Sequence, residues 1–196
     1  MINYQSKIEK LISELCPNGV GVKRLGEMIK RNPFKQLGAG ELKNLIINNG
    51  DVKLLPSSKN YDWFTDEVTA GDYICEGEVI TMGRARYANI KYWHGKFVAA
   101  NNHLITSYNP KKVLTRYLYH FILNHVKEFY VETSTYPKLD TTILNKFIIP
   151  VPPLAIQEEI VKILDNFTEL EAELEARKKQ YEYYRNKLLT FKEYVS

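Results

Sequence analysis

The sequence IIPVPPLAIQEEIVKILD, at residues 148–165, divides the chain into two parts with different patterns. Its prolines, at positions 150, 152 and 153, cannot lie inside a helix or a central strand, because proline lacks the backbone N–H and has a fixed φ angle. After them, apolar residues return every third or fourth position, which is the spacing of one helix face. We therefore expect a globular body up to residue 153 and a helix from residue 154 onward.

The predicted C-terminal helix carries a continuous apolar seam. Alternating steps of three and four residues connect its positions, which are Ile160, Ile163, Phe167, Leu170, Leu174, Arg177, Tyr181, Tyr184, Leu188, Phe191 and Val195. Only Arg177 puts a charge into this heptad pattern, and no glycine or proline follows Pro153, so one unbroken helix is predicted from 157 to 191. At 1.5 Å per residue, such a helix is about 50 Å long.

A helix of this length cannot bury its seam against a small body, so the seam needs a partner helix. We expect a coiled-coil dimer, and the residues expected to hold it are Ile160, Ile163, Phe167, Leu170, Leu174, Tyr181, Tyr184 and Leu188. The alternative is a break near Asp165 and Asn166, after which the helix would fold back onto its own body.

The body shows patterns of both helices and strands. Apolar residues at helical spacing between positions 8 and 15, followed by Pro17, predict a short amphipathic helix. Short apolar or alternating runs predict strands at 45–47, 52–55, 79–82, 90–93, 97–100 and 104–106. Asn49-Gly50 is a hairpin turn signal, and His94-Gly95 is a weaker one. One further helix is predicted from about residue 112 to residue 131.

The predicted fold class is α+β. It comprises a globular domain with a twisted, mostly antiparallel sheet and a few helices, followed by one long coiled-coil α-helix. The expected domains are an N-terminal amphipathic helix at 1–19, the globular domain at 20–153, and the long helix at 154–196, which serves dimerisation and spacing.

Basic residues are concentrated in one window of the body. Residues 1–150 hold 20 Lys and Arg against 14 Asp and Glu, whereas residues 151–196 hold 7 against 9. Between Glu78 and Glu128 there is no acidic residue, although this window contains all four histidines of the chain. Because Lys and Arg neutralise phosphates, the window favours a nucleic acid as partner. A solvated basic face is the alternative.

Three polar clusters in the body have the residue types that read DNA. Arginine and lysine donate to guanine and phosphate, asparagine suits adenine, and aromatic rings offer stacking faces. The candidate DNA-binding residues are Arg84, Arg86, Tyr87, Asn89 and Lys91 in the first cluster, Asn101, Asn102 and His103 in the second, and Ser134, Thr135, Tyr136 and Lys138 in the third. For each of them, a role as a solvated loop side chain is the alternative.

The sequence gives little support to an enzyme. The G-x-x-x-x-G-K-[ST] motif of P-loop ATPases is missing. His120 and His125 are five residues apart, a spacing that does not put two imidazoles on one helix face, so no metal site is predicted. The catalytic alternative is a stand-alone Mg-dependent endonuclease, in which Glu41, Asp51 and Lys53 would hold the metal against a phosphate. Asp51 directly follows a predicted turn, so turn chemistry is the favoured role for it.

Two motifs resemble a known family. Residues 148–165 and the sequence KKQYEYYRNKLL at residues 178–189 are similar to the conserved helix, and its junction with the preceding domain, in specificity subunits of type I restriction-modification systems. The resemblance implies that 20–153 is a target recognition domain for double-stranded DNA, and that the chain has neither a catalytic site nor a cofactor. It also implies two kinds of partner, a modification (methyltransferase) subunit that uses S-adenosylmethionine and a restriction subunit that uses ATP and Mg.

Full-length members of this family have two recognition domains and two long helices packed antiparallel, whereas this chain has one of each. The resemblance therefore implies either a homodimer through the C-terminal helix or a fragment completed by another chain.

The sequence contains no recognisable signal peptide and no stretch of about 18 apolar residues. We expect no membrane association and a cytoplasmic location.

Overall fold

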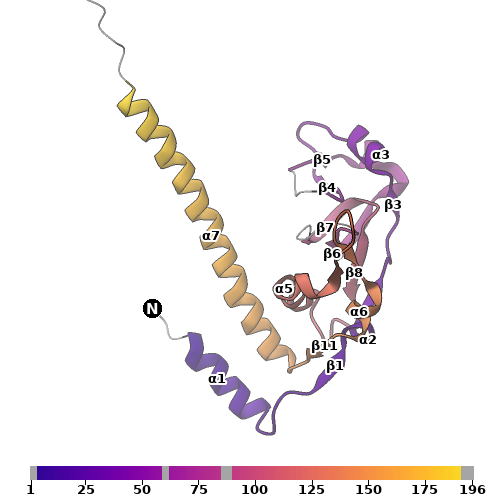
Figure 1. Cartoon of the computed structure of the whole chain (residues 1–196), viewed down its shortest axis with the longest axis vertical. Coiled ribbons are helices and arrows are strands. Elements are labelled where there is room, and N and C mark those ends of the chain that lie inside the picture. Colours follow the sequence, from indigo (N-terminus) through magenta and orange to yellow (C-terminus); the bar gives the residue numbers. More distant parts are fainter. Residues whose placement is uncertain (1–3, 59–61, 85–89, 191–196) are drawn as a thin grey trace, which may run out of the picture.

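A computed structural model of the chain describes residues 4–58, 62–84 and 90–190. Figure 1 shows a compact body built around a sheet, from which one long helix projects as a rod. Among the described residues, no helix is long and apolar enough to cross a membrane.

One seven-stranded sheet forms the centre of the body. Its strands are β2 (Ile29–Arg31), β3 (Gln36–Leu37), β4 (Val52–Leu55), β5 (Phe64–Thr65), β6 (Cys75–Met82), β7 (Lys91–Ala100) and β8 (His103–Ser107). The order is β2-β8-β6-β7-β4-β5, with β3 beside β7. Only β3 and β4 run parallel to β7, and the other neighbouring pairs are antiparallel. The predicted α+β class with a mostly antiparallel sheet is confirmed.

Two small strand pairs and several helices complete the molecule. The pairs are β1 (Val22–Arg24) with β11 (Ile148–Pro150), and β9 (Tyr130–Val131) with β10 (Lys138–Leu139). The helices are α1 (Tyr4–Leu15), α2 (Leu25–Met28), α3 (Ala39–Asn44), α4 (Glu67–Ala70), α5 (Thr115–Asn124), α6 (Thr141–Lys146) and α7 (Leu154–Leu189), with 3-10 turns at Gly71–Tyr73 and Val126–Phe129.

Four local predictions were wrong. Residues 45–47 are not a strand, because Leu45 ends α3 and Ile47 makes only an isolated bridge to Phe64. Asn49 does take the positive φ angle of a turn, at 68°, but this turn does not connect the two strands of a hairpin. Gly50 is needed there for space, since a Cβ atom would lie 2.2 Å from the carbonyl oxygen of Thr65.

His94-Gly95 is not a turn either, because β7 passes straight through it. Gly95 lies opposite Gly77 of β6, and both glycines have positive φ angles, 127° and 125°. The helix predicted from 112 to 131 is also shorter than expected, since α5 ends at Asn124 and a 3-10 turn and β9 follow it. A glycine inside a long strand interrupts the alternating pattern of the sequence. A helix that changes from α to 3-10 type likewise gives no clear helical periodicity at its end.

The main core lies between the sheet and α5. Leu118 and Ile122 of α5 are fully buried in one cluster with Ile80 of β6 and Ile105 of β8. Each such side chain contributes about 1.5–3 kcal/mol through burial. The other side of α5 faces α7, so this short helix connects the sheet to the rod (Figure 1).

A buried glutamine fixes the start of α7. Gln157 is 0% exposed, and its Oε1 accepts from the backbone N–H of Leu114 at 2.9 Å. Its Nε2 donates to the carbonyl oxygens of Lys112, at 2.9 Å, and Pro152, at 2.7 Å. All three partners are backbone groups, so the first turn of α7 is held against the segment that leads into α5.

A second polar contact lies two turns further along α7. Asp165 accepts from Arg116 Nε at 2.9 Å and pairs with His120 Nε2 at 2.7 Å, both on α5. Burial works against the charged carboxylate, but the hydrogen bonds from these two residues outweigh it and lower the pKa of Asp165. At the base of the rod, Lys7 of α1 pairs with Glu159.

Beyond this contact, α7 continues without a break. The helix has 36 residues, which corresponds to about 54 Å, and every residue from 166 to 190 is exposed. The unbroken helix predicted from the sequence is thus confirmed over the described residues. The alternative of a break near residues 165 and 166 is wrong.

We predict that Gln157→Leu lowers the free energy of unfolding by about 3 kcal/mol, because three buried backbone groups lose their hydrogen-bond partner. Urea unfolding followed by circular dichroism measures the effect. The neighbouring exposed variant Glu158→Leu serves as the control and is expected to change stability by less than about 0.5 kcal/mol. Equal stability of the two variants would contradict the role given to Gln157.

Candidate DNA interface

The three polar clusters predicted from the sequence meet at one end of strands β6 and β8. Met82, the last residue of β6, pairs with His103, the first residue of β8. The carbonyl oxygen of Arg84 accepts from the backbone N–H of Leu139 in β10, at 3.1 Å. Residues about 20 and 55 positions apart in the sequence therefore share one edge of the body.

A buried tyrosine ties the first cluster to the third. The hydroxyl of Tyr130, in β9, donates to the carbonyl oxygen of Gly83 at 2.6 Å. Burial raises the pKa of Tyr130 to about 12, so the hydroxyl keeps its proton and remains a donor at neutral pH. This bond helps to fix the chain just before Arg84, whose own side chain is exposed.

The third cluster forms an exposed loop between β9 and β10, as predicted. Ser134, Thr135 and Tyr136 are all exposed, and the Thr133 hydroxyl donates to the carbonyl oxygen of Tyr136 at 2.6 Å, which closes the loop. The ammonium group of Lys138 lies 5.9 Å from the centre of the Tyr136 ring. The loop thus offers hydroxyls, one aromatic face and one positive charge to a ligand.

His103 lies inside the edge rather than on it. It is 6% exposed, and its Nε2 has no hydrogen-bond partner among the described residues. Burial, together with the positive charges of Arg31 and Arg84, lowers the pKa of His103 to about 4. The imidazole is therefore neutral at pH 7, and the cations near it are the two arginines.

Arg31 is a candidate that the sequence patterns did not identify. It is exposed at the end of β2, and it reaches this edge because β2 pairs with β8 and places Arg31 opposite Ile105. The pair Lys30-Arg31 lies far from the acid-free window in the sequence. Only the pairing of the strands brings it beside Arg84.

Two other candidates are buried. Lys91 is 5% exposed, and its ammonium group donates to the carbonyl oxygen of Pro56 at 2.7 Å, while burial lowers its pKa to about 8. Asn102 is 0% exposed, and its side chain donates to the carbonyl oxygen of Leu55 at 3.4 Å. In this conformation neither side chain reaches the surface, so both support the strands rather than meet a ligand directly.

Four members of the first two clusters remain, and the structure describes one of them, Asn101. Asn101 is exposed, and its backbone N–H is held by the carbonyl oxygen of Leu37 at 3.0 Å. Arg86, Tyr87 and Asn89 lie outside the described residues.

The three residues of the nuclease alternative have other contacts. Glu41 caps its own helix, since its Oε2 accepts from the backbone N–H of Gly38 at 2.7 Å. Lys53 is 4% exposed, pairs with Asp62 at 3.2 Å and lies over the ring of Phe64. Asp51 is exposed just before β4. Within residues 4–58, 62–84 and 90–190, no three His, Cys, Asp or Glu side chains are grouped so that they could hold a metal ion.

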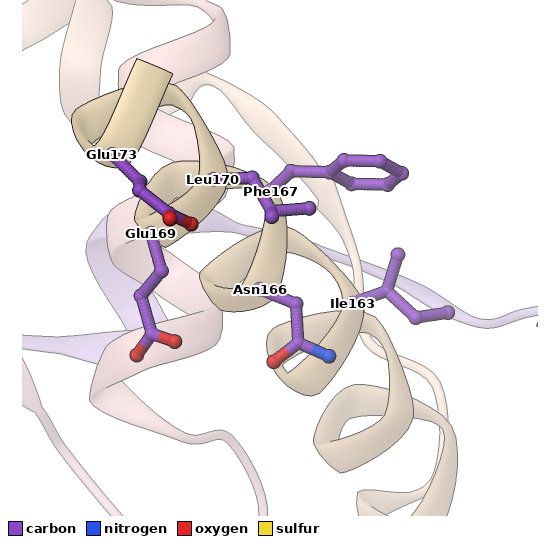
Figure 2. Close-up of a pocket in the computed structure, with 6 residues that line it drawn as sticks. All are labelled: Ile163, Asn166, Phe167, Glu169, Leu170 and Glu173. Atoms are coloured by element: carbon purple, nitrogen blue, oxygen red, sulfur yellow. The ribbon is translucent and has the colours of Figure 1, made fainter. Parts of the chain in front are cut away.

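The predicted dimerisation residues occupy one side of α7. Ile160 and Ile163 are half-buried, whereas the others are between 49% and 69% exposed, namely Phe167, Leu170, Leu174, Tyr181, Tyr184 and Leu188. Figure 2 shows Ile163 and Phe167 projecting from one side of the helix, and Glu169 and Glu173 from the other. Phe191 and Val195 lie outside the described residues.

Comparison with known proteins identifies relatives over most of the chain. Residues 17–181 match the family model described as type I restriction modification DNA specificity domain. A putative type I restriction enzyme specificity subunit of Haemophilus influenzae is 32% identical over 164 residues, which are 78% of this chain and 42% of the relative. The EcoR124I/EcoR124II specificity subunit of Escherichia coli is 42% identical over 99 residues, 46% of this chain and 24% of the relative.

Solved structures show the same fold. The S subunit of the type I restriction-modification system of M. genitalium superposes with a TM-score of 0.55 at 14% identity, over 86% of this chain and 46% of that one. The HsdS subunit of Thermoanaerobacter tengcongensis gives 0.53 at 14% identity, over 89% and 46%. The chain thus spans less than half the length of each of these relatives. Because the family model covers most of its residues, the chain belongs to the type I restriction-modification DNA specificity domain family.

Proposed function

We propose that this chain reads a DNA sequence for a type I restriction-modification system and carries out no chemistry itself. The observation that carries the proposal is the joining of the three polar clusters at one edge of the body in a member of this family. Exposed Arg31, Arg84 and Lys138 there supply positive charge, which attracts the phosphate backbone without regard to sequence. Exposed Asn101, and the loop with Ser134, Thr135 and Tyr136, supply groups that can contact base edges.

In this proposal the catalytic work belongs to other subunits. A modification subunit with S-adenosylmethionine methylates the recognised DNA, and a restriction subunit with ATP and Mg cleaves DNA, so this chain needs no cofactor. A solved structure that this chain resembles concerns the complex assembly of the type I R-M system, which supports the expectation of such partners. The site of action is the cytoplasm, where the DNA of a bacterial host lies.

We further propose that residues 1–19 form an accessory helix, 20–153 the target recognition domain and 154–196 the dimerisation and spacing helix. Two copies pair through α7, with the seam residues buried between them. A two-fold dimer reads a two-fold symmetric, interrupted DNA site, because each recognition domain contacts one half-site.

Selection from a library of random DNA duplexes tests this function. The purified chain is incubated with the library, and bound duplexes are sequenced at several salt concentrations. We expect one enriched motif of two half-sites around an unread spacer, with affinity that falls steeply as salt rises. Binding with no enriched motif, or cleavage of DNA by the chain alone with Mg²⁺, would contradict the proposal.

We predict that the double variant Arg84→Ala and Arg86→Ala weakens DNA binding at least several-fold, because two donors to phosphate or guanine are lost beside the shared edge. Fluorescence anisotropy with a selected duplex at moderate salt measures the affinity. Lys179→Ala, an exposed cation on α7, is the matched control and should bind normally. If the double variant folds and binds like the wild type, these two arginines do not belong to the interface.

We also predict that Leu170→Glu with Leu174→Glu converts the dimer into monomers, because it places charge in the apolar seam. Specific DNA binding should fall with it, since one recognition domain holds only one half-site. Ala172→Glu, on the opposite side of the same helix, is the control and should remain dimeric. Light scattering gives the oligomeric state, and a monomeric wild type at micromolar concentration would rule out the symmetric pair.

A further inference from the structure

The charges of α7 are divided along its length. The acids Glu169, Glu171, Glu173 and Glu175 lie in its middle, and the bases Arg177, Lys178, Lys179, Arg185 and Lys187 follow them, with only Glu182 among the bases. An acidic segment is thus followed directly by a basic one, and both are exposed. Such an arrangement complements itself when a second copy runs in the opposite direction.

Part of this charge is already paired within the helix. Arg177 pairs with Glu173 at 2.6 Å, and Lys179 pairs with Glu175 at 2.7 Å. Glu171 and Lys178 take part in no ion pair within the described part of the chain. Both occupy the position that directly follows a seam residue, where charged side chains set partner and orientation in coiled coils.

A parallel pair in register is unfavourable for this helix. It would place Arg177 of each copy against Arg177 of the other inside the apolar seam, and it would bring the two acidic segments side by side. An antiparallel pair brings each acidic segment beside the basic segment of the other copy. The charges of α7 are therefore consistent with the antiparallel direction that the family resemblance implies.

For the antiparallel pair of α7 helices that the family resemblance implies, we propose the register whose two-fold axis passes between Glu175 and Ala176. This proposal rests on the self-pairing that the proposed function includes, and it adds the partner residue at each level. The seam residues that face each other are Ile163 and Leu188, Phe167 and Tyr184, Leu170 and Tyr181, and Leu174 and Arg177. On one flank, Glu171 of each copy meets Lys178 of the other, so these two charges, which form no ion pair within one described chain, neutralise each other.

Neighbouring registers are less favourable. A shift of one heptad in one direction sets Glu171 against Glu171 and Glu173 against Glu173. The opposite shift gains pairs of Glu171 with Arg185 and of Glu173 with Lys187, but it sets Lys178 against Lys178. It also sets Ile163 and Phe167 opposite positions 195 and 191, which lie outside the described residues, whereas the proposed register sets them opposite Leu188 and Tyr184 of the described helix. Burying a phenylalanine stabilises a pair more than exposed ion pairs do, so the proposed register is favoured.

A groove between α5 and α7 fits this arrangement. It has a volume of about 660 Å³ and is lined by Phe121 and Leu123 of α5 and by Leu164, Phe167 and Glu171 of α7, among others. In the proposed register, Tyr184 and Arg185 of the second copy pass at the level of Leu164 and Phe167. An aromatic ring and a cation thus meet an apolar groove with a carboxylate at its rim.

Disulfide formation between introduced cysteines tests the register. In a full-length chain with Cys16→Ser and Cys75→Ser, the pair Phe167→Cys with Tyr184→Cys should oxidise to a covalent dimer. The two cysteines of one chain are about 26 Å apart along α7 and cannot bond to each other. Phe167→Cys alone should stay uncrosslinked, because its two copies are the same distance apart.

Two control results would overturn the register. Crosslinking of Phe167→Cys alone would mean a parallel pair, and preferential crosslinking of Leu174→Cys with Tyr184→Cys would mean a register shifted by one heptad. If light scattering shows a dimer but none of these pairs crosslinks, the proposed alignment of α7 is also wrong. In each of these cases DNA selection by the wild type is unaffected, so the proposed function is judged separately.

A charge exchange tests the same register with the seam left intact. Glu171→Lys alone and Lys178→Glu alone should each raise the dimer dissociation constant by about tenfold, because each creates two like-charge contacts. An equimolar mixture of the two variants should form a heterodimer about as stable as the wild type, since both contacts then become Lys with Glu. Glu169→Lys, which points away from the seam, is the control and should change the constant by less than about twofold (Figure 2).

The single variant Lys178→Glu separates this register from the shifted one. In the shifted alternative, Lys178 faces Lys178, so Lys178→Glu alone would replace one like-charge contact by another and leave the dissociation constant nearly unchanged. Failure of the mixture to recover, with both single variants still selecting the wild-type DNA motif, would refute the register and leave the DNA-reading function standing.

Discussion

The structure depends on the hydrogen bonds of one buried side chain, Gln157. This residue joins the first turn of α7 to the backbone before α5 and to the proline segment, and it is shielded completely from solvent. Asp165 adds a second point of attachment through Arg116 and His120. Two attachments along one helix fix both its position and its direction. The globular body and the long helix α7 therefore have a defined relative position, although most of α7 touches nothing else in the described chain.

Sequence reasoning was most successful where a single pattern extends over many residues. The heptad spacing after Pro153 predicted α7 correctly, because a long amphipathic helix depends on local periodicity and on the absence of glycine and proline. It was less successful inside the body. Gly95 looked like part of a turn, yet it lies in the middle of β7 opposite Gly77, and only the pairing of two distant strands makes this conformation possible.

In the candidate interface too, features that depend on neighbouring residues were predicted from the sequence, and features that depend on strand pairing were not. The exposed loop before Lys138 was predicted because polar residues and a proline lie together in the sequence. The burial of Lys91 and Asn102 was not predicted, because charge and polarity do not reveal which face of a strand points inward. Arg31 was missed for a related reason, since it reaches this edge only through the pairing of β2 with β8.

The contacts of Gln157 also bear on how the chain can change over generations. Its three partners are backbone groups of Lys112, Leu114 and Pro152, so the bonds do not depend on the side chains at those positions. A substitution in the body preserves the joint as long as the backbone path there is kept. Recombination that keeps this backbone path can thus exchange one body for another on the same helix, and the surface of the body can change without redesign of the helix that it is joined to.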